Sequence, residues 1–559
     1  MRQYGQRRTG SRVRLPRRRL LIGGFTATGS ALLLAACGGS DTSDSGAGGS
    51  TAREDKLVAE TATPQPGGTL TIATATEAPN LDAHRSAAAQ TAVTVGPVYS
   101  RLLTFKTGSG VDPWGNVIIG DLAERWEQPN DTTYVFSLRP DAKWQNVAPV
   151  NGRPLTAEDI VYSLNRIRTR EPEYTYGYLF ELIDTLEATD PRTVRITTSQ
   201  PFAPFLDNLA NQNALIVPRE AVESFGDLKQ NAVGSGPFTL TEAAKGNRYV
   251  YEKNPNYYLP GQPYVDKMTL LILPDEAYRV SALRSKQVDI LNVNKPQKDE
   301  LTHSDRSLVL QTVAGSAGTR LAINNTRPPF NDVRVREAVN RALDRKALIA
   351  TILEGDGKIT GPLSSNLASW SVPDSEIEEA YRTDVQKAKQ LLADAGFPNG
   401  FKTTWEVSGQ TSPTNLKVME IMKEQLKAAG IDMTIDNLEY AVWQKHANTF
   451  DFVAFFTGMR AFSDPDNYLY RLYHPKSPQR YSEPDNAELV ALIDKQRATL
   501  NLEQRKTAVL EAQRLILRDH YTAGIYDAPL YYLSQPHVKG WSPTGATGNI
   551  EYVHAWVEK

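Results

Sequence analysis

The alternation of hydrophobic and polar residues from Gly68 onward predicts a mixed succession of strands and helices. Residues 69–73 (TLTIA) and 133–138 (TYVFSL) alternate with a period of two, which is typical of strands that cover a core on one face. Residues 157–167 follow Thr156, and a carboxylate stands three positions after that hydroxyl, which indicates a capped amphipathic helix. Strands and helices alternate through most of the body, so the expected fold class is α/β (mixed α+β).

Start and stop residues predict further helices in the second half of the chain. An aspartate at each start is expected to cap one helix over residues 332–349 and another over residues 384–395. A third is expected over residues 414–429, where a glycine ends it and the strand 431–435 follows.

The first 37 residues follow a different pattern: a basic segment, an apolar run and a cysteine. Eight Arg and no Asp or Glu stand in the first 36 residues, and the apolar run covers Leu20 to Leu34. About 20 residues are needed to span a membrane, so this shorter run favours a cleaved export signal at 1–36. A single membrane-spanning helix and a chance cysteine in an ordinary signal are the alternatives. Residues 37–67, rich in Gly, Ser and Thr with few large apolar side chains, are expected to form a disordered tether.

Cys37 is the only cysteine of the chain, which excludes an intramolecular disulfide and a multi-cysteine metal site. Residues 34–37 (LAAC) resemble the lipobox of bacterial lipoproteins, in which the cysteine is diacylated and the chain is cut before it. Residues 17–21 (RRRLL) also resemble a twin-arginine export signal, so the Sec and twin-arginine routes both stay open. Without the eight N-terminal arginines the formal charge of −2 becomes −10, and such an acidic body lacks the basic face that nucleic-acid binding requires.

The sequence carries no motif for covalent chemistry, a metal or a cofactor. Its seven histidines are far apart, and neither H-E-x-x-H nor G-x-S-x-G occurs. Residues 355–358 (GDGK) lack the spacing of a phosphate-binding loop, and residues 464–467 (DPDN) lack the glycine and glutamate of an EF-hand. We therefore expect a protein that is not an enzyme and holds no cofactor or metal.

Six ordered segments, which together run along nearly the whole mature chain, carry a family resemblance. They are residues 68–82, 122–163, 234–258, 324–338, 388–400 and 450–467. They resemble the family 5 extracellular solute-binding proteins, the peptide and nickel receptors of ABC importers, and the second segment (LAERW…NGRPLTAEDIVYS) is the most specific. The resemblance implies a type II periplasmic-binding-protein clamshell with two lobes, a hinge and a third, inserted domain. The implied boundaries are 68–86, 194–313 and 527–559 for lobe I, 87–193 for the inserted domain and 314–526 for lobe II.

The same resemblance implies a solute site in the cleft between the lobes. Its expected residues are Glu77, Ala78, Pro79, Tyr440, Trp443, Phe456, Thr457, Gly458, Met459, Arg460 and Ala461. In peptide receptors of this family, an aspartate three residues before the Asp-Pro or Glu-Pro pair holds the α-ammonium of the peptide, and here that position is Ala461. Glu77 on the opposite wall is a candidate replacement for this charge, whereas Arg460 is suited to an anion.

The expected function is that of a monomeric, lipid-anchored receptor on the outer face of the membrane. It would deliver a small solute or short peptide to an ABC permease, with no nucleic acid as partner. Sugars, opines and metal chelates are the alternative solutes. A surface lipoprotein of the same fold that acts as a sensor or hydrolase is the alternative function.

Overall fold

The computed structural model describes residues 62–86, 88–171, 173–174, 176–477, 479–483, 485–545 and 550–559, which all belong to one compact unit, Leu57–Lys559. The predictions for the export signal, for Cys37 and for most of the tether lie outside the described residues. Among the helices of the described part, none has both the length and the hydrophobicity needed to cross a membrane.

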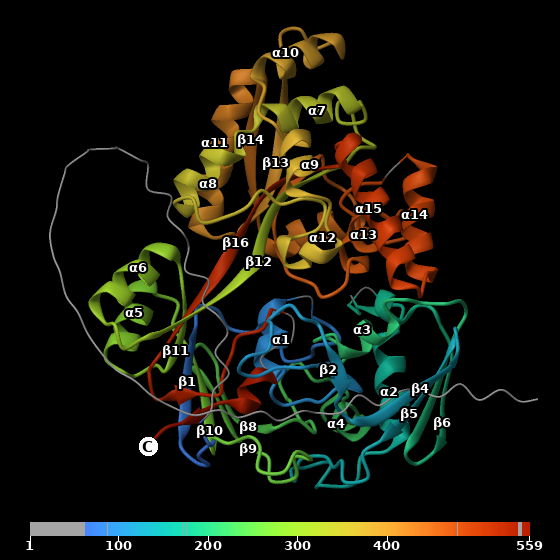
Figure 1. Cartoon of the computed structure of the whole chain (residues 1–559), viewed down its shortest axis with the longest axis vertical. Coiled ribbons are helices and arrows are strands. Elements are labelled where there is room, and N and C mark those ends of the chain that lie inside the picture. Colours follow the sequence, from blue (N-terminus) through green and yellow to red (C-terminus); the bar gives the residue numbers. More distant parts are fainter. Residues whose placement is uncertain are drawn as a thin grey trace, which may run out of the picture. The chain divides into compact units, whose positions relative to one another are not determined.

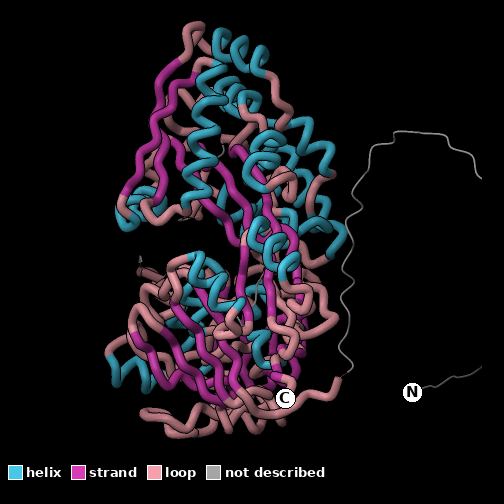
Figure 2. The backbone as a smooth tube through the Cα atoms, turned by 90° about the vertical axis from the view of Figure 1, so that its left-hand side faces the viewer, coloured by secondary structure: helices cyan, strands magenta, loops and turns pink. Residues whose placement is uncertain are grey.

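A ten-stranded sheet runs through this unit in the order β14-β13-β15-β12-β16-β11-β1-β10-β9-β8. Its two long central strands, β12 (Val309–Ile323) and β16 (Thr522–Ser534), pair antiparallel and pass from the lower to the upper body (Figures 1 and 2). The strands on one side of them belong to what we call the first lobe: β1 (Thr69–Thr74), β8 (Phe238–Ala244), β9 (Arg248–Lys253), β10 (Lys267–Ile272) and β11 (Ile290–Val293). Those on the other side belong to the second lobe: β13 (Phe401–Ser408), β14 (Ile431–Leu438) and β15 (Ala454–Arg460).

The two long strands connect the lobes, and their pairing is irregular where they cross between them. The register of β12 against β16 shifts between Val313 and Ala317 and again between Thr319 and Arg320. Such bulges bend and twist a strand pair locally. Gly315 lies within the first irregularity at a φ of +66°, a conformation that favours glycine. The lobe boundaries expected after residues 313 and 526 fall inside these strands, beside the irregular stretch, and the division into lobes stays a prediction.

A four-stranded antiparallel layer, ordered β4-β5-β7-β6, stands beside the first lobe. Its strands are β4 (Ala123–Asn130), β5 (Thr133–Leu138), β6 (Ile183–Asp190) and β7 (Thr193–Thr198), and helix α2 (Ala157–Ile167) covers it. The predicted capping box of α2 is present, since the backbone N–H of Thr156 donates to Asp159 Oδ2 at 2.8 Å. β7 pairs with β5 and β6, so this layer of strands runs to Thr198, five residues beyond the end at 193 expected for the inserted domain, and that boundary stays a prediction. One hydrophobic core joins this layer to the first lobe and continues into buried residues of the second lobe, such as Leu472 and Ile493. We treat the layer and the first lobe together as the first-lobe side.

Four helices cover the sheet of the second lobe around a separate core: α7 (Val333–Ala342), α8 (Arg345–Leu353), α10 (Val385–Asp394) and α11 (Pro413–Ala429). The starts and ends of α10 and α11 confirm the sequence predictions. The prediction of one helix over 332–349 is wrong, because the chain leaves helical geometry at Leu343. Asp344 then caps a new helix by accepting from the backbone N–H of Ala347 at 2.9 Å.

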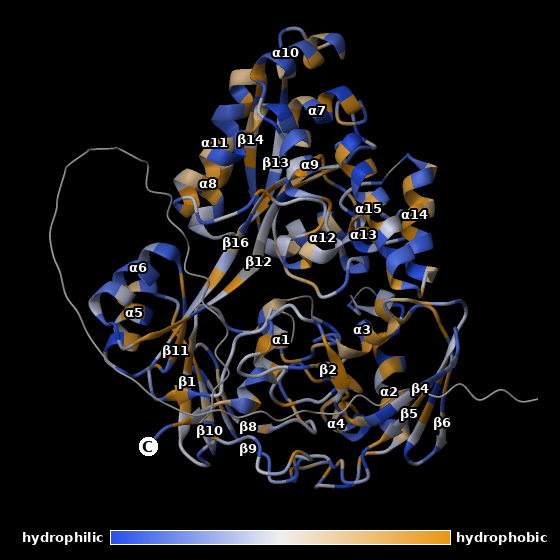
Figure 3. Cartoon of the chain, viewed as in Figure 1, coloured by the Kyte–Doolittle hydropathy of each residue, from blue (hydrophilic) through white to orange (hydrophobic). Residues whose placement is uncertain are grey.

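The remaining elements complete the two lobes. On the first-lobe side they are α1 (Ala89–Val95), α3 (Phe205–Ala210), α4 (Arg219–Phe225), α5 (Glu276–Arg284), α6 (Lys295–Ser304), η1 (Gly177–Phe180), η3 (Ile550–His554), β2 (Leu103–Phe105), β3 (Ile118–Gly120), β17 (Val538–Lys539) and β18 (Trp556–Val557). In the second lobe they are α9 (Asp374–Ala380), α12 (Tyr440–Thr449), α13 (Asp466–Tyr473), α14 (Ala487–Ala498), α15 (Leu502–Arg518) and η2 (Ser365–Trp370). Figure 3 shows hydrophobic and hydrophilic residues alternating along α11 and α14, as expected for helices that cover a core on one face.

Candidate functional site

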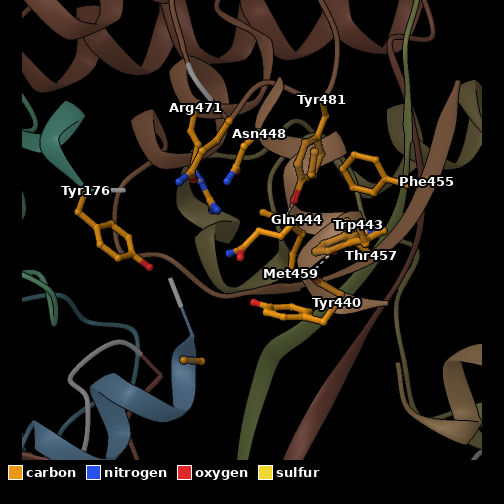
Figure 4. A pocket seen from close by; sticks show the side chains of 14 residues that line it. Tyr176, Tyr440, Trp443, Gln444, Asn448, Phe455, Thr457, Met459, Arg471 and Tyr481 are labelled. Carbon is orange, nitrogen blue, oxygen red and sulfur yellow. Dashed lines mark hydrogen bonds between the residues drawn. The ribbon is translucent and has the colours of Figure 1, made fainter. Parts of the chain in front are cut away.

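A cavity of about 250 Å³ lies where α12, β15 and α13 of the second lobe meet residues of the first-lobe side (Figure 4). We call it the central cavity. Ala89 and Tyr176 line it from the first-lobe side. The lining residues from the second lobe are Tyr440, Trp443, Gln444, Ala447, Asn448, Phe455, Thr457, Gly458, Met459, Arg471, Gln479 and Tyr481.

Two wider cavities adjoin the central cavity. One of about 870 Å³ shares Ala89 and Tyr440 with it, and another of about 560 Å³ shares Asn448 and Gln479. Each of the two also takes lining residues from both lobes. We call the three adjoining cavities the trough; its middle part has the smallest volume and the two end parts have larger volumes.

One face of α12 supplies much of the central wall. Its lining residues are Tyr440, Trp443, Gln444, Ala447 and Asn448, spaced i, i+3, i+4, i+7 and i+8 as one helix face requires. The Glu439 carboxylate caps the helix by accepting from the backbone N–H groups of residues 441 and 442, at 2.9 and 3.3 Å. None of the ten residues of α12 is fully buried, so this face is available to the trough.

Aromatic side chains form the floor of the central cavity. Tyr440 stacks on Trp443 with ring centroids 6.2 Å apart, and Trp443 meets the edge of Phe455 at 5.4 Å (Figure 4). Tyr481 contacts the other side of Phe455 at 5.1 Å. Burial, together with nearby Tyr176 across the trough, raises the pKa of the Tyr440 hydroxyl. This hydroxyl therefore stays neutral at physiological pH and can donate or accept a hydrogen bond.

Arg471 is the one charged residue among the described residues that line the central cavity. It belongs to α13, whose other seven residues are all buried. Its Nε donates to Gln479 Oε1 at 2.5 Å, and its guanidinium lies over the Phe462 ring at 4.9 Å. Figure 4 shows the guanidinium pointing into the cavity, on the side away from Tyr440 and Trp443. The central cavity thus carries a positive charge.

The structure brings most of the expected site residues to the trough. Tyr440, Trp443, Thr457, Gly458 and Met459 line the central cavity. Glu77, Ala78 and Pro79 line the 870 Å³ cavity with Lys229 and Lys245. Arg460 is the last residue of β15.

Phe456 and Ala461 do not line the trough. Side chains on a strand point alternately to opposite faces, so Phe455 and Thr457 face the cavity while Phe456 enters the core of the second lobe. Ala461 is only 4% exposed and is absent from the lining of all three cavities. Both residues therefore lie outside the lining of these three cavities, and a role for them in solute binding stays a prediction.

Other lining residues were not expected from the sequence. Helical spacing from Tyr440 places three of them, Gln444, Ala447 and Asn448, on the same face of α12. The helical period of this segment could therefore have predicted that they line the site. Tyr176, Arg471 and Tyr481 reach the cavity through the tertiary fold, and no local pattern marks them.

The Asp-Pro segment that precedes α13 forms a buried polar junction between the lobes. Ser463 Oγ donates to Asp207 Oδ1, on α3 of the first-lobe side, at 2.7 Å. Asp464 accepts two hydrogen bonds from Arg505, at 2.8 and 2.6 Å. Burial, reinforced by the Asp464 carboxylate, raises the pKa of Asp207 to about 8. Within the described residues, no group of His, Cys, Asp or Glu side chains is arranged to hold a metal ion.

Two lobes joined by shared strands, with a trough lined from both, define a two-lobed binding protein. Residues 117–479 match the model of the bacterial extracellular solute-binding proteins, family 5. This match covers more than half of the chain, and the chain belongs to that family. Its members are binding proteins.

Curated relatives and solved structures agree with this placement. Heme-binding protein A of Haemophilus influenzae is 28% identical over 477 residues, covering 80% of this chain and 85% of that protein. The dipeptide-binding protein of Escherichia coli is 28% identical over 456 residues, covering 76% of this chain and 83% of that protein. The periplasmic binding protein DppA of Helicobacter pylori, in complex with the peptide STSA, superimposes with a TM-score of 0.76 at 25% identity, covering 89% of this chain and 99% of that chain.

Proposed function

We propose that this chain is the lipid-anchored, extracytoplasmic receptor of an ABC importer and that it captures a short peptide in the trough. The observation that carries the proposal is the central cavity, because its walls come from both lobes and one of them is the aromatic face of α12. Ligand sites in proteins are concave and mostly apolar, with a few placed polar groups. This cavity combines such walls with amide and hydroxyl groups.

The shape of the trough favours an extended solute. Typical ligand pockets measure about 300–1,000 Å³, and the central cavity of about 250 Å³ opens into neighbours of about 560 and 870 Å³. A peptide backbone in the narrow part would leave room for side chains at both ends. The relatives named for a dipeptide and solved with a peptide support this solute class.

The function requires binding energy and no covalent step. A solute that contacts both walls stabilises the arrangement in which the lobes enclose it, and a permease that docks this arrangement receives loaded receptors. The chain would then return the solute chemically unchanged, in contrast to a surface hydrolase of the same fold.

The N-terminal segment supports a membrane-anchored location. Two acyl chains on Cys37 are sufficient for stable anchoring, whereas one is marginal. A coil of about 30 residues after that cysteine would reach on the order of 30 Å. The receptor would therefore stay near a permease in the same membrane.

A small anionic solute, such as an opine or a sugar acid, is the second candidate. The observation that favours it is the charge of the central cavity: Arg471 lines it, and no carboxylate does among the described residues. Ala461 agrees with this, since the carboxylate that holds an α-ammonium in peptide receptors of the family is missing at its position.

Native mass spectrometry of the purified protein tests the proposal, because a retained solute would be weighed directly. We expect one protein chain with one short peptide, and a stability that rises by about 2.7 kcal/mol when that peptide is supplied at 100 times its Kd. A protein that retains nothing, and that no peptide or small solute stabilises, would overturn the proposal. A solute converted to products would indicate the hydrolase instead.

A further inference from the structure

We infer that Arg471 anchors an anionic group, most simply a carboxylate, of the solute in the centre of the trough. The inference rests on the proposed function of the trough and names the chemistry of its ligand. It assigns a specificity-determining role to a residue of α13 that no sequence motif marks.

Two contacts fix the position of the Arg471 guanidinium and leave its terminal nitrogens available to a ligand. Gln479 accepts from Nε at 2.5 Å, and the Phe462 ring supports one face of the group. Among the described residues, neither terminal nitrogen donates to a protein acceptor. These two nitrogens form the planar fork that matches a carboxylate with two parallel hydrogen bonds.

Two buried arginines of the second lobe, Arg505 and Arg497, are matched by protein carboxylates. Arg505 forms two hydrogen bonds with Asp464, and Arg497 pairs with Asp466 and Glu181. Arg471 has no salt bridge to any described residue. Its Nε is bonded to Gln479, but leaving the two terminal nitrogens of a half-buried guanidinium without an acceptor is unfavourable. An anionic solute would supply the partner for these two nitrogens.

The remaining lining of the central cavity favours the same ligand charge. The side chains of Gln444 and Asn448 and the hydroxyl of Tyr440 all offer hydrogen-bond donors there, and no carboxylate is present among the described residues. A free ammonium placed in this cavity would meet the charge of Arg471 without a compensating anion. Within the central cavity, a carboxylate of the solute is thus favoured over an amine.

Matched acid and amide pairs test the inference without knowledge of the natural solute. The pairs are trialanine with trialanine amide, and gluconate with gluconamide, and affinity is measured by calorimetry on the purified protein. In at least one pair the acid should bind about tenfold or more tightly than the amide. Arg471→Gln should abolish that difference, and Arg471→Lys should restore part of it by returning the charge.

A control variant separates the anchor from the general electrostatic field. Lys445 is exposed on α12 outside the lining of the trough, so Lys445→Gln removes one nearby positive charge and should leave the difference between acid and amide unchanged. Equal affinities within both pairs in the unmodified protein would overturn the inference. A difference that survives Arg471→Gln in a variant with unchanged thermal stability would also overturn it.

The same experiment distinguishes this inference from the proposed function. If only the gluconate pair binds, and binds through Arg471, the peptide proposal fails and the anion anchor stands. If both peptides bind with equal affinity, the peptide proposal stands and the anion anchor fails.

Discussion

The guanidinium of Arg497, on α14 of the second lobe, donates to Glu181 Oε1 of the first-lobe side at 2.9 Å. The Arg497 side chain is only 5% exposed, and its Nε lies 3.2 Å from Asp466 Oδ2 within its own lobe. Tyr470 and Phe202 contact its guanidinium, the first from the second lobe and the second from the first-lobe side. Arg497 therefore ties the lobes together at a point remote in sequence from the strands β12 and β16.

Loss of Glu181, the partner of Arg497 in the other lobe, should lower the affinity for the solute more than it lowers the stability of the fold. Glu181→Gln removes this ion pair between the lobes, leaves Arg497 paired with Asp466, and keeps a side chain of similar size in the lining of the 560 Å³ cavity. An ion pair with one partly exposed partner contributes about 0.2–1 kcal/mol, so we expect affinity for the solute to fall by up to about fivefold. Calorimetric titration of the variant measures this change.

Glu187→Gln is the matched control, because Glu187 is exposed on β6 and forms no salt bridge with a described residue. It should leave both affinity and thermal stability unchanged. An affinity of Glu181→Gln equal to that of the unmodified protein would show that the Arg497–Glu181 contact does not contribute to the solute-bound arrangement.

The buried contact between Ser463 and Asp207 predicts that the stability of the protein depends on pH. The pKa of Asp207 is about 8 in the folded protein, raised by burial and then by Asp464, against about 3.9 in an unfolded chain. The folded state therefore holds a proton that the unfolded state has lost between about pH 4 and 8. The contribution of Asp207 to stability is fully present below pH 4 and is lost as pH rises through 8, at up to about 1.4 kcal/mol per pH unit.

Asp207→Asn removes this titration while it keeps an oxygen that can accept from Ser463 Oγ. Compared with the unmodified protein, the variant should lose less stability between pH 5 and 9 and should be the more stable of the two at pH 9. Urea unfolding at several pH values measures both effects. If the free energy of unfolding changed with pH in the same way in both proteins, the assignment of the buried proton to Asp207 would be contradicted.

Local signals in the sequence predict the helix ends well, because the groups that cap a helix are its sequence neighbours. Asp159 and Gly430 illustrate this, since each acts within a few residues of its own position. The break at Asp344 has the same local cause and was open to prediction. The order of the ten strands could not be predicted in this way. β12 pairs with β16 across about 200 positions, and such a pairing depends on tertiary packing.

Phe456 provides a test of how β15 faces the trough. Because it packs in the second-lobe core, Phe456→Ala should lower the free energy of unfolding by about 3–5 kcal/mol. Phe456→Leu keeps most of the hydrophobic volume and should leave solute affinity unchanged within twofold. If Phe456→Leu weakened binding without loss of stability, Phe456 would belong to the trough after all.

Trp443 should report solute binding by its fluorescence. It lines the central cavity between Tyr440 and Phe455, so a bound solute changes its environment. Trp443→Phe should abolish most of the fluorescence change while affinity falls no more than about threefold, and Trp443→Ala should weaken binding about tenfold. Trp126→Phe, in β4 of the first-lobe side, is the control and should retain the signal. A full signal in Trp443→Phe would contradict this placement.

The candidate site was predictable only where it follows one element. Tyr440, Trp443 and the rest of that face of α12 share a helical period, and the alternation of β15 separates Phe455 from Phe456. Arg471 approaches from a helix that is otherwise buried, and Tyr176 comes from the opposite lobe. Their meeting depends on how the tertiary fold places the two lobes across the trough, which no local pattern encodes.

The distance between the lobes, measured with and without solute, tests the central claim most directly. In a Cys37→Ser background, Lys245→Cys on the rim of the first lobe and Lys445→Cys on α12 carry a pair of fluorophores for energy transfer. Lys387→Cys with Lys445→Cys, both in the second lobe, forms the control pair and should not respond. The solute, identified by its mass, is added to saturation. The distribution of distances between the fluorophores at positions 245 and 445 should then become narrower and shift to a shorter distance. A distribution that saturating solute leaves unchanged would contradict a receptor that encloses its solute between two lobes.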